Sequence, residues 1–299
     1  MEASRATTTR PAAAPLATVL ADYFTLTKPR VQLLLLLTTI TTMYVAGDPS
    51  VGLVAVTVVG GFLSAGGASA FNHYYDRDID AAMARTAGRP VPSGRVSPRA
   101  ALAYAGALQV ASFALLGLAV NLLSACLALA GFLWYTGVYT VWLKRRSPQN
   151  IVIGGAAGAV PPLVGWAAVT GSVAPAALYL FAIVFYWTPP HFWALSLLMK
   201  DEYARVGVPM MPVVHGESET RRQIVLYTLL LAVLTLLPVA FGFFGAVYAV
   251  VAAGLAAAFI ALAVRLQRRA DRRSALRTYL FSLAYLAALF AAMVLDARL

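Results

Sequence analysis

The chain alternates between long runs without a charged residue and short connections that hold its charges. Six runs contain no Asp, Glu, Lys or Arg: 31–47, 49–75, 100–143, 147–199, 223–264 and 278–295. A helix of about 20 apolar residues crosses a bilayer, so the three longest runs hold two spans each and the others one each. The pattern predicts an all-α, polytopic membrane protein with nine transmembrane helices, near 31–47, 51–73, 100–119, 122–143, 151–170, 175–199, 223–242, 246–265 and 277–296.

The composition supports this prediction and excludes other classes of protein. Hydrophobic residues make up 61% of the chain and charged residues 12%, far from the roughly 45–50% and 25% of soluble domains. The single cysteine, Cys126, excludes a scaffold of intrachain disulfides, and solidly apolar runs exclude an outer-membrane barrel, whose strands would alternate. The net charge of +11 does not indicate nucleic acid, because the basic residues flank the spans.

Those basic residues also predict the orientation. Every Lys and Arg except Arg298 lies before the first span or around the connections that follow spans two, four, six and eight. By the positive-inside rule this side is the cytoplasm, or the matrix in an organelle. We expect a cell inner membrane with the C-terminus outside. We expect residues 1–27 to be a flexible cytoplasmic tail and residues 28–299 to be one domain, with its functional loops on the cytoplasmic side.

The first acidic connection starts where the second span ends. On a continued helix, positions four apart drift by about 40° per step, so Asn72, Asp76 and Asp80 would share one face. Aligned carboxylates at membrane depth need a cation, and an oxygen-only donor set favours magnesium. Asp78 would point away and pair with a loop arginine. The alternative is that these acids only balance nearby arginines in a solvated loop.

The second acidic connection follows the sixth span. Asp201 and Glu202 are adjacent, so both cannot face one way on a helix, and a second ion site and plain surface charge both stay open. Pro189 and Pro190 precede it and should break or bend their helix where the backbone lines a cavity.

These residues resemble a known family. Asn72-x-x-x-Asp76-x-x-x-Asp80, followed by Arg85-Thr86-x-x-Arg89-Pro90, resembles the first aspartate-rich motif of the UbiA superfamily of intramembrane prenyltransferases. Within it, residues 72–86, 188–195 and 207–213 resemble the haem-farnesylating branch, and the resemblance covers about residues 20–296. Many members carry a second motif of two spaced Asp. Here Leu197 and Arg205 stand four positions from Asp201, and the acidic pair resembles the haem branch instead.

The resemblance implies a UbiA-like fold, nine helices around a central chamber, and a reaction. Farnesyl diphosphate would ionise with Mg²⁺ as cofactor, a vinyl group of haem B would attack the C1 carbocation, and water would complete the hydroxyethylfarnesyl side chain of haem O. The implied catalytic residues are Asn72, Asp76, Asp80, Asp201 and Glu202, of which Asn72, Asp76, Asp80 and Asp201 would bind metal. The candidates for the diphosphate are Arg77, Arg85, Arg89, Lys200 and Arg205.

The three histidines, His73, His191 and His215, all lie near the cytoplasmic side. A haem substrate makes each a candidate iron ligand, with a hydrogen-bonded structural histidine as the alternative. The implied partners are the two substrates, membrane lipid, and a haem A synthase or a terminal oxidase assembly partner. No nucleic acid is expected to bind.

Two other functions compete with this interpretation. The nearer one keeps the chemistry but uses an aromatic acid or a quinone precursor as acceptor. The other is a transporter, whose broken helices and membrane-buried charges can look similar. Against a transporter, the acids cluster at cytoplasmic span ends rather than at midplane. Release of diphosphate that depends on magnesium would distinguish an enzyme from a carrier.

The predicted orientation can be tested with a reporter fused after Leu299. A reporter that is active only in the cytoplasm should be silent there, because an odd number of spans puts this end outside. Activity at this position would contradict the nine-span prediction.

Overall fold

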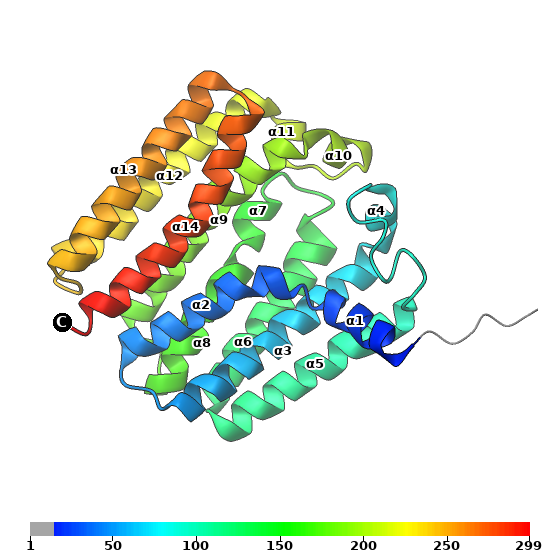
Figure 1. Cartoon of the computed structure of the whole chain (residues 1–299), viewed down its shortest axis with the longest axis horizontal. Coiled ribbons are helices and arrows are strands. Elements are labelled where there is room, and N and C mark those ends of the chain that lie inside the picture. Colours follow the sequence, from blue (N-terminus) through cyan, green and yellow to red (C-terminus); the bar gives the residue numbers. More distant parts are fainter. Residues whose placement is uncertain (1–14) are drawn as a thin grey trace, which may run out of the picture.

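The structure, a computed structural model, describes residues 15–299. All regular structure in this range is helical, which confirms the predicted all-α class. Figure 1 shows long helices packed side by side, with the short helices α4 (Arg77–Ala82) and α10 (Lys200–Arg205) at one end and the C-terminus at the other. The two acidic connections therefore lie at the same end of the bundle.

The long helices follow the predicted spans closely. They are α2 (Pro29–Ala46), α3 (Val51–Tyr75), α5 (Pro98–Ala119), α6 (Leu122–Leu133) continued by η1 (Trp134–Leu143), α7 (Asn150–Gly154) continued by α8 (Ala156–Thr170), α9 (Pro175–Leu198), α12 (Gly216–Ala240), α13 (Ala246–Arg269) and α14 (Arg272–Asp296). In the described range, eight of these segments are long and apolar enough to cross a membrane, and α9 is not among them. The protein is thus an integral membrane protein, but the count of nine spans is not confirmed.

The segment before the first span differs from the predicted flexible tail. Residues 1–14 lie outside the described range, but residues Leu16–Leu26 form helix α1. Its Tyr23 ring meets Tyr104 of α5 edge-on at 5.0 Å, and Asp22 pairs with Arg95 at 3.0 Å. Apolar and charged contacts together hold α1 against the bundle, although the composition of residues 1–27 suggested no packed element.

Helix α9 differs from the prediction in another way. The helix runs without a break through Pro189 and Pro190, so the predicted break is wrong. Both prolines are buried, and Thr188 Oγ1 bonds the Val184 carbonyl at 2.8 Å. A proline pair can stay inside a membrane helix when neighbouring helices enclose it, because they hold the backbone where hydrogen bonds are missing.

Small residues allow the helices to approach closely. A Cβ on Gly67 of α3 would lie 2.9 Å from the Ala105 carbonyl oxygen of α5, and one on Gly165 of α8 would lie 2.4 Å from the Thr39 carbonyl oxygen of α2. Glycine at such crossings lets backbones touch, which is a common basis for helix association in membranes.

An apolar cluster joins the two acidic connections. Ile79 and Met83, from α4 and the residue after it, pack with Ile151 of α7 and with Val208 and Met210, which follow α10. Met210 leads into α11 (Met211–Val214), which precedes α12. Burial of these side chains from water fixes α4 beside the segment after α10, since each buried residue of this kind contributes about 1.5–3 kcal/mol.

The close approach of α8 to α2 generates a prediction about stability. Gly165→Ala should lower the free energy of unfolding by about 1–3 kcal/mol, because the new methyl group would overlap the Thr39 carbonyl oxygen. Thermal melting of the purified protein in detergent would measure this. Gly158→Ala on the same helix is the matched control, since nothing lies within 4 Å of its Cβ. Equal melting temperatures for the two variants would contradict the predicted close packing.

Candidate active site

The candidate site is built on the helical stripe at the end of α3. Asp76 joins α3 to α4, yet the backbone bonds continue, with Asp76 N to Asn72 O at 2.9 Å and Asp80 N to Asp76 O at 2.8 Å. Asn72 Nδ2 donates to Asp76 Oδ2 at 2.6 Å, which confirms the shared face predicted for these two residues. Asp80 follows one turn later, and all three side chains are buried. The chain therefore holds two carboxylates away from water at the end of a membrane helix.

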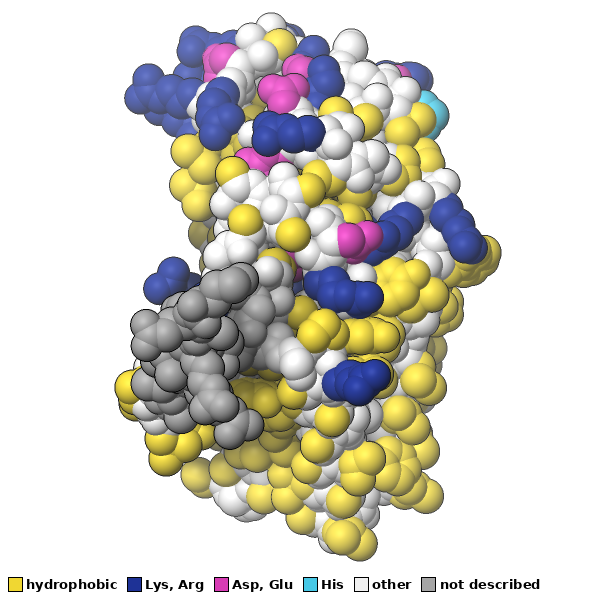
Figure 2. All heavy atoms as spheres, turned by 90° about the vertical axis from the view of Figure 1, so that its right-hand side faces the viewer, with side chains coloured by type: hydrophobic (Ala, Val, Ile, Leu, Met, Phe, Trp, Pro, Cys, Tyr) yellow, Lys and Arg dark blue, Asp and Glu magenta, His cyan; other side chains and the backbone are white. Residues whose placement is uncertain are grey.

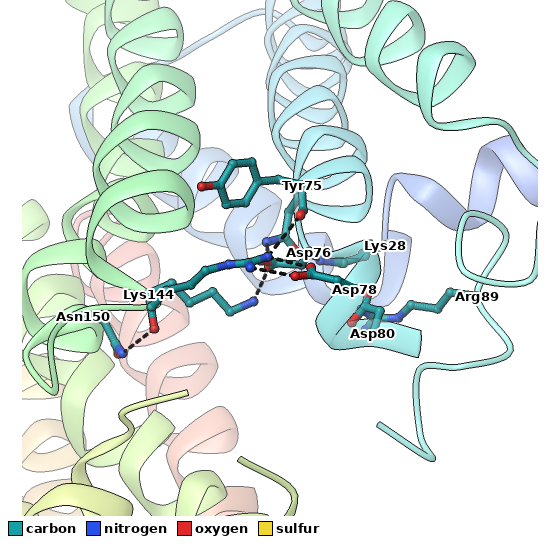
Figure 3. Close-up of polar contacts among 10 residues, drawn as sticks. Lys28, Tyr75, Asp76, Asp78, Asp80, Arg89, Lys144 and Asn150 are labelled. Carbon is teal, nitrogen blue, oxygen red and sulfur yellow. Dashed lines mark hydrogen bonds and ion pairs between the residues drawn. The ribbon is translucent and has the colours of Figure 1, made fainter. Parts of the chain in front are cut away.

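Cations from three other segments surround the stripe, as Figure 3 shows. Lys144, which follows η1, pairs with Asp76, and Arg145 lies 3.4 Å from the same carboxylate. Arg89 contacts both oxygens of Asp80, at 2.8 and 2.7 Å. Lys28 Nζ donates to Asn72 Oδ1 at 2.8 Å. Because a buried carboxylate is stable only when it is paired, this network explains how the stripe exists at this depth.

The irregular winding of η1 positions Lys144. Residues Trp134–Leu143 form a π-helix, and the Lys144 N–H bonds the Tyr139 carbonyl at 2.8 Å, five residues earlier. Turns of this kind are uncommon and often occur at functional sites. The sequence predicted the span but not this winding, which directs an ammonium group at Asp76.

Asp78 is not part of the buried stripe, and it shares Arg145 with Asp76. Its exposed carboxylate receives two hydrogen bonds from Arg145, at 2.7 and 2.8 Å. These bonds lower the pKa of Asp78 to about 2, so it stays ionised. The predicted pairing with a loop arginine is thus confirmed, although the arginine comes from the connection between η1 and α7.

Lys28 stands at the junction of α1 and α2. Its backbone is left-handed, with φ 52° and ψ 57°, one of two such non-glycine residues in the described range. Burial lowers the pKa of its amine to about 7, and the cations Arg89 and Lys144 act in the same direction. A residue in a strained backbone conformation beside a polar network is often functional.

Of the residues predicted to bind the diphosphate, the structure brings Arg89 alone to the stripe by direct contact. Arg77 donates to the Tyr74 carbonyl and lies over the Tyr74 ring, and Lys200 pairs with Glu217. Arg85 and Arg205 are exposed and make no ion pair within residues 15–299.

The predicted metal ligands are not all brought together. Within the described residues no three His, Cys, Asp or Glu side chains form a metal-binding group, so Asp201 does not join Asp76 and Asp80. Asp201 is exposed, whereas Glu202 is partly buried and its Oε2 is a buried oxygen without a hydrogen-bond partner. The donors of the stripe, two buried carboxylates and the Asn72 amide oxygen, are all hard, so their chemistry fits magnesium.

The three histidines have different surroundings. His191 is buried, its ring stacks on Trp187 at 4.3 Å, and its Nδ1 lies 2.7 Å from Ser282 Oγ. Ser282 already donates its proton to the Tyr279 carbonyl at 2.6 Å, so His191 Nδ1 must be the donor and its Nε2 carries the lone pair. His73 is 1% exposed and neither ring nitrogen has a partner. His215 is exposed at the start of α12.

The sequence analysis missed Lys28, Lys144 and Arg145 as members of the site. It used these residues only to assign orientation. Their position along the chain could have identified them, because each stands directly at the end of a span on the side where the stripe begins.

Comparison with known proteins agrees with the all-helical fold described above. The model of the UbiA prenyltransferase family matches residues 35–289. The chain belongs to this family. It is 56% identical over 280 residues to a protoheme IX farnesyltransferase of Roseiflexus sp. (strain RS-1), covering 93% of this chain and 52% of the relative. It is 57% identical over 237 residues to one of Trichodesmium erythraeum (strain IMS101), covering 78% and 72%.

The chain spans about half the length of the Roseiflexus and Chloroflexus relatives that it matches. Solved structures share its fold. A digeranylgeranylglyceryl phosphate synthase has a TM-score of 0.78 at 18% identity, covering 94% of this chain and 100% of that one. A UbiA homologue from Archaeoglobus fulgidus bound to DMAPP and Mg²⁺ has a TM-score of 0.69 at 18% identity, covering 91% and 99%.

The charge network generates a prediction about stability. Arg145→Gln should lower the free energy of unfolding by about 1–2 kcal/mol, between the values typical of exposed and buried ion pairs, because it removes contacts to Asp76 and Asp78. Arg146→Gln is the matched control, since Arg146 is exposed and makes no ion pair within residues 15–299. Melting curves would compare the two, and an equal effect would mean that the network does not stabilise the fold.

Proposed function

We propose that the protein transfers a farnesyl group from farnesyl diphosphate to a vinyl group of haem B. The vinyl group attacks C1 of the farnesyl group as diphosphate leaves, and water adds to the resulting cation with loss of a proton, giving the hydroxyethylfarnesyl side chain of haem O. The observation that carries the proposal is the buried stripe of Asn72, Asp76 and Asp80 with cations from three other segments. Relatives more than half identical to this chain are named protoheme IX farnesyltransferase, and this supports the choice of donor and acceptor.

The donor would bind at the stripe. Ionisation breaks the bond between C1 and oxygen, and the electron pair leaves with the diphosphate. Cations aimed at that charge in a site shielded from water stabilise the transition state, and removing one such group typically costs about 10²–10³ in rate. Magnesium, held by Asn72, Asp76 and Asp80, would act as a Lewis acid on the diphosphate. Lys144 and Arg89, which now pair with the carboxylates, would then be free to contact the diphosphate oxygens.

Glu202 is the proposed contribution of the second acidic connection. Its partly buried side chain carries an oxygen without a partner, whereas Asp201 is exposed to solvent. An unpartnered buried carboxylate oxygen is costly unless a cation approaches it. We therefore assign Glu202 rather than Asp201 to the polar wall of the donor site.

His191 is the proposed axial ligand for the haem iron. Ser282 fixes the tautomer by accepting from Nδ1, which leaves the Nε2 lone pair available. Ligating histidines commonly have their second nitrogen oriented in this way. The neighbouring rings of Trp187 and Tyr279, at 4.3 and 4.9 Å from the imidazole, would shield reactive carbon from water.

We also propose the cytoplasmic membrane as the location, with the stripe on the cytoplasmic side. Figure 2 looks onto the right-hand side of Figure 1 and shows basic and acidic side chains over the upper and middle part of this face, with hydrophobic side chains below. This segregation supports a bilayer boundary across the bundle, with the charged end in the cytoplasm.

Substitution of the stripe tests the proposed chemistry. Asp76→Asn and Asp80→Asn should each lower farnesyl transfer to haem B by at least about 100-fold, because each keeps the size of the side chain but removes a charge that the metal and the diphosphate need. The measurement is the yield of haem O, by mass, from purified protein with farnesyl diphosphate, haem B and Mg²⁺.

Asp78→Asn is the matched control, because Asp78 is exposed and its only ion pair within the described residues is with Arg145, so it contacts neither Asn72 nor Asp80. It should retain activity within a few-fold. Equal loss in all three variants would contradict the role of the helical face. If the unmutated protein did not bind haem but transferred the prenyl group to 4-hydroxybenzoate, the acceptor would be an aromatic acid instead.

A further inference from the structure

A groove of about 400 Å³ opens between the end of α1 and the start of α2, and the reaction proposed above leaves it unassigned. Its polar wall consists of Lys28, Arg30, His73 and Arg89, and its apolar wall includes Phe24 and Val31. No acidic residue is among the described residues that line it. A cationic wall beside an apolar one suits a ligand with an acidic edge and an apolar body.

The basic side chains of the groove differ in the residues that they contact. Lys28 and Arg89 contact Asn72 and Asp80, so the groove borders the stripe through these two side chains. Arg30 is exposed and makes no ion pair within residues 15–299. Its guanidinium group is therefore available for an incoming carboxylate, which it can bind through two parallel hydrogen bonds.

His73 adds an unsatisfied polar group to the same wall. It is 1% exposed, and neither Nδ1 nor Nε2 has a hydrogen-bond partner. A buried donor left unpaired is unfavourable, so such a group in a native structure usually meets a ligand or water. A neutral imidazole has one N–H to donate, and a carboxylate would accept it.

The turn that carries Lys28 is firmly held. Leu26 and Thr27 are buried, and Gln32 Nε2 donates to the Thr27 carbonyl at 2.6 Å. These contacts maintain the left-handed backbone of Lys28, which is unfavourable for a residue other than glycine. The structure thus places a basic side chain at the border between the groove and the stripe at the expense of local strain.

We infer that this groove binds the carboxylate edge of the acceptor, namely the two propionates of haem B, with Arg30 and Lys28 as ion-pair partners and His73 as hydrogen-bond donor. The inference rests on the proposed function. It separates the two substrates, because the donor diphosphate lies at the stripe and the acceptor carboxylates lie in the groove. Lys28 and Arg89 border both, so the acceptor docks beside the donor.

The test compares haem B with its dimethyl ester, which lacks the two negative charges. Binding to the purified full chain is followed by the change in the Soret band. Arg30→Gln should weaken haem B binding about tenfold, equivalent to about 1.4 kcal/mol, and should leave the ester nearly unaffected. Arg30→Lys should recover part of the loss. Arg268→Gln, on the exposed end of α13, is the matched control and should change neither.

Three results would overturn the inference. One is equal affinity of the unmutated protein for haem B and its ester, and another is an effect of Arg30→Gln no larger than that of Arg268→Gln. The third is that Arg30→Gln weakens Mg²⁺-dependent binding of farnesyl diphosphate instead of haem, which would assign the groove to the donor. Failure of the proposed function is distinct, because the unmutated protein would then neither bind haem nor farnesylate it, and the inference would fall with it.

Discussion

The pairing of two buried carboxylates with cations from distant parts of the chain is the interaction on which this structure depends. Asp76 and Asp80 are 1% and 4% exposed at the end of a membrane helix. Arg89, from the loop that follows α4, neutralises Asp80, and Lys144, two spans further along the chain, neutralises Asp76. Breaking one partner of such a pair typically costs about 3–5 kcal/mol, because the remaining charge stays buried. The ends of α3, η1 and the loop after α4 are therefore fixed relative to one another.

The same constraint prepares the chemistry. In the proposed reaction, the ammonium and guanidinium groups that neutralise the carboxylates would exchange partners when a metal and a diphosphate bind, so the total charge of the site would stay balanced. The apolar cluster around Ile79 and Met210 keeps the second acidic connection beside α4 while this happens. In the proposed reaction, the groove with Arg30 and His73 would receive the acceptor beside the stripe, with Lys28 at the border between them.

The sequence predicted the helical spans well, because uncharged runs of fixed length report burial in lipid directly. It also predicted the face shared by Asn72 and Asp76, since helical spacing is a local property. It missed Lys28 and Lys144 as partners of the stripe because their contacts join residues 44 and 68 positions apart. It did not predict the continuous α9, because the support for Pro189 and Pro190 comes from neighbouring helices. It did not predict helix α1, because contacts with the rest of the bundle stabilise a segment whose composition alone does not indicate a helix.

A structure of the protein with Mg²⁺ and farnesyl thiolodiphosphate, a donor analogue that ionises poorly, would test the central claim most directly. The account predicts that Asp76 and Asp80 face the metal and that Lys144 and Arg89 have left them to contact the diphosphate oxygens. It would be contradicted if the Lys144–Asp76 and Arg89–Asp80 pairs stayed intact while the analogue bound elsewhere.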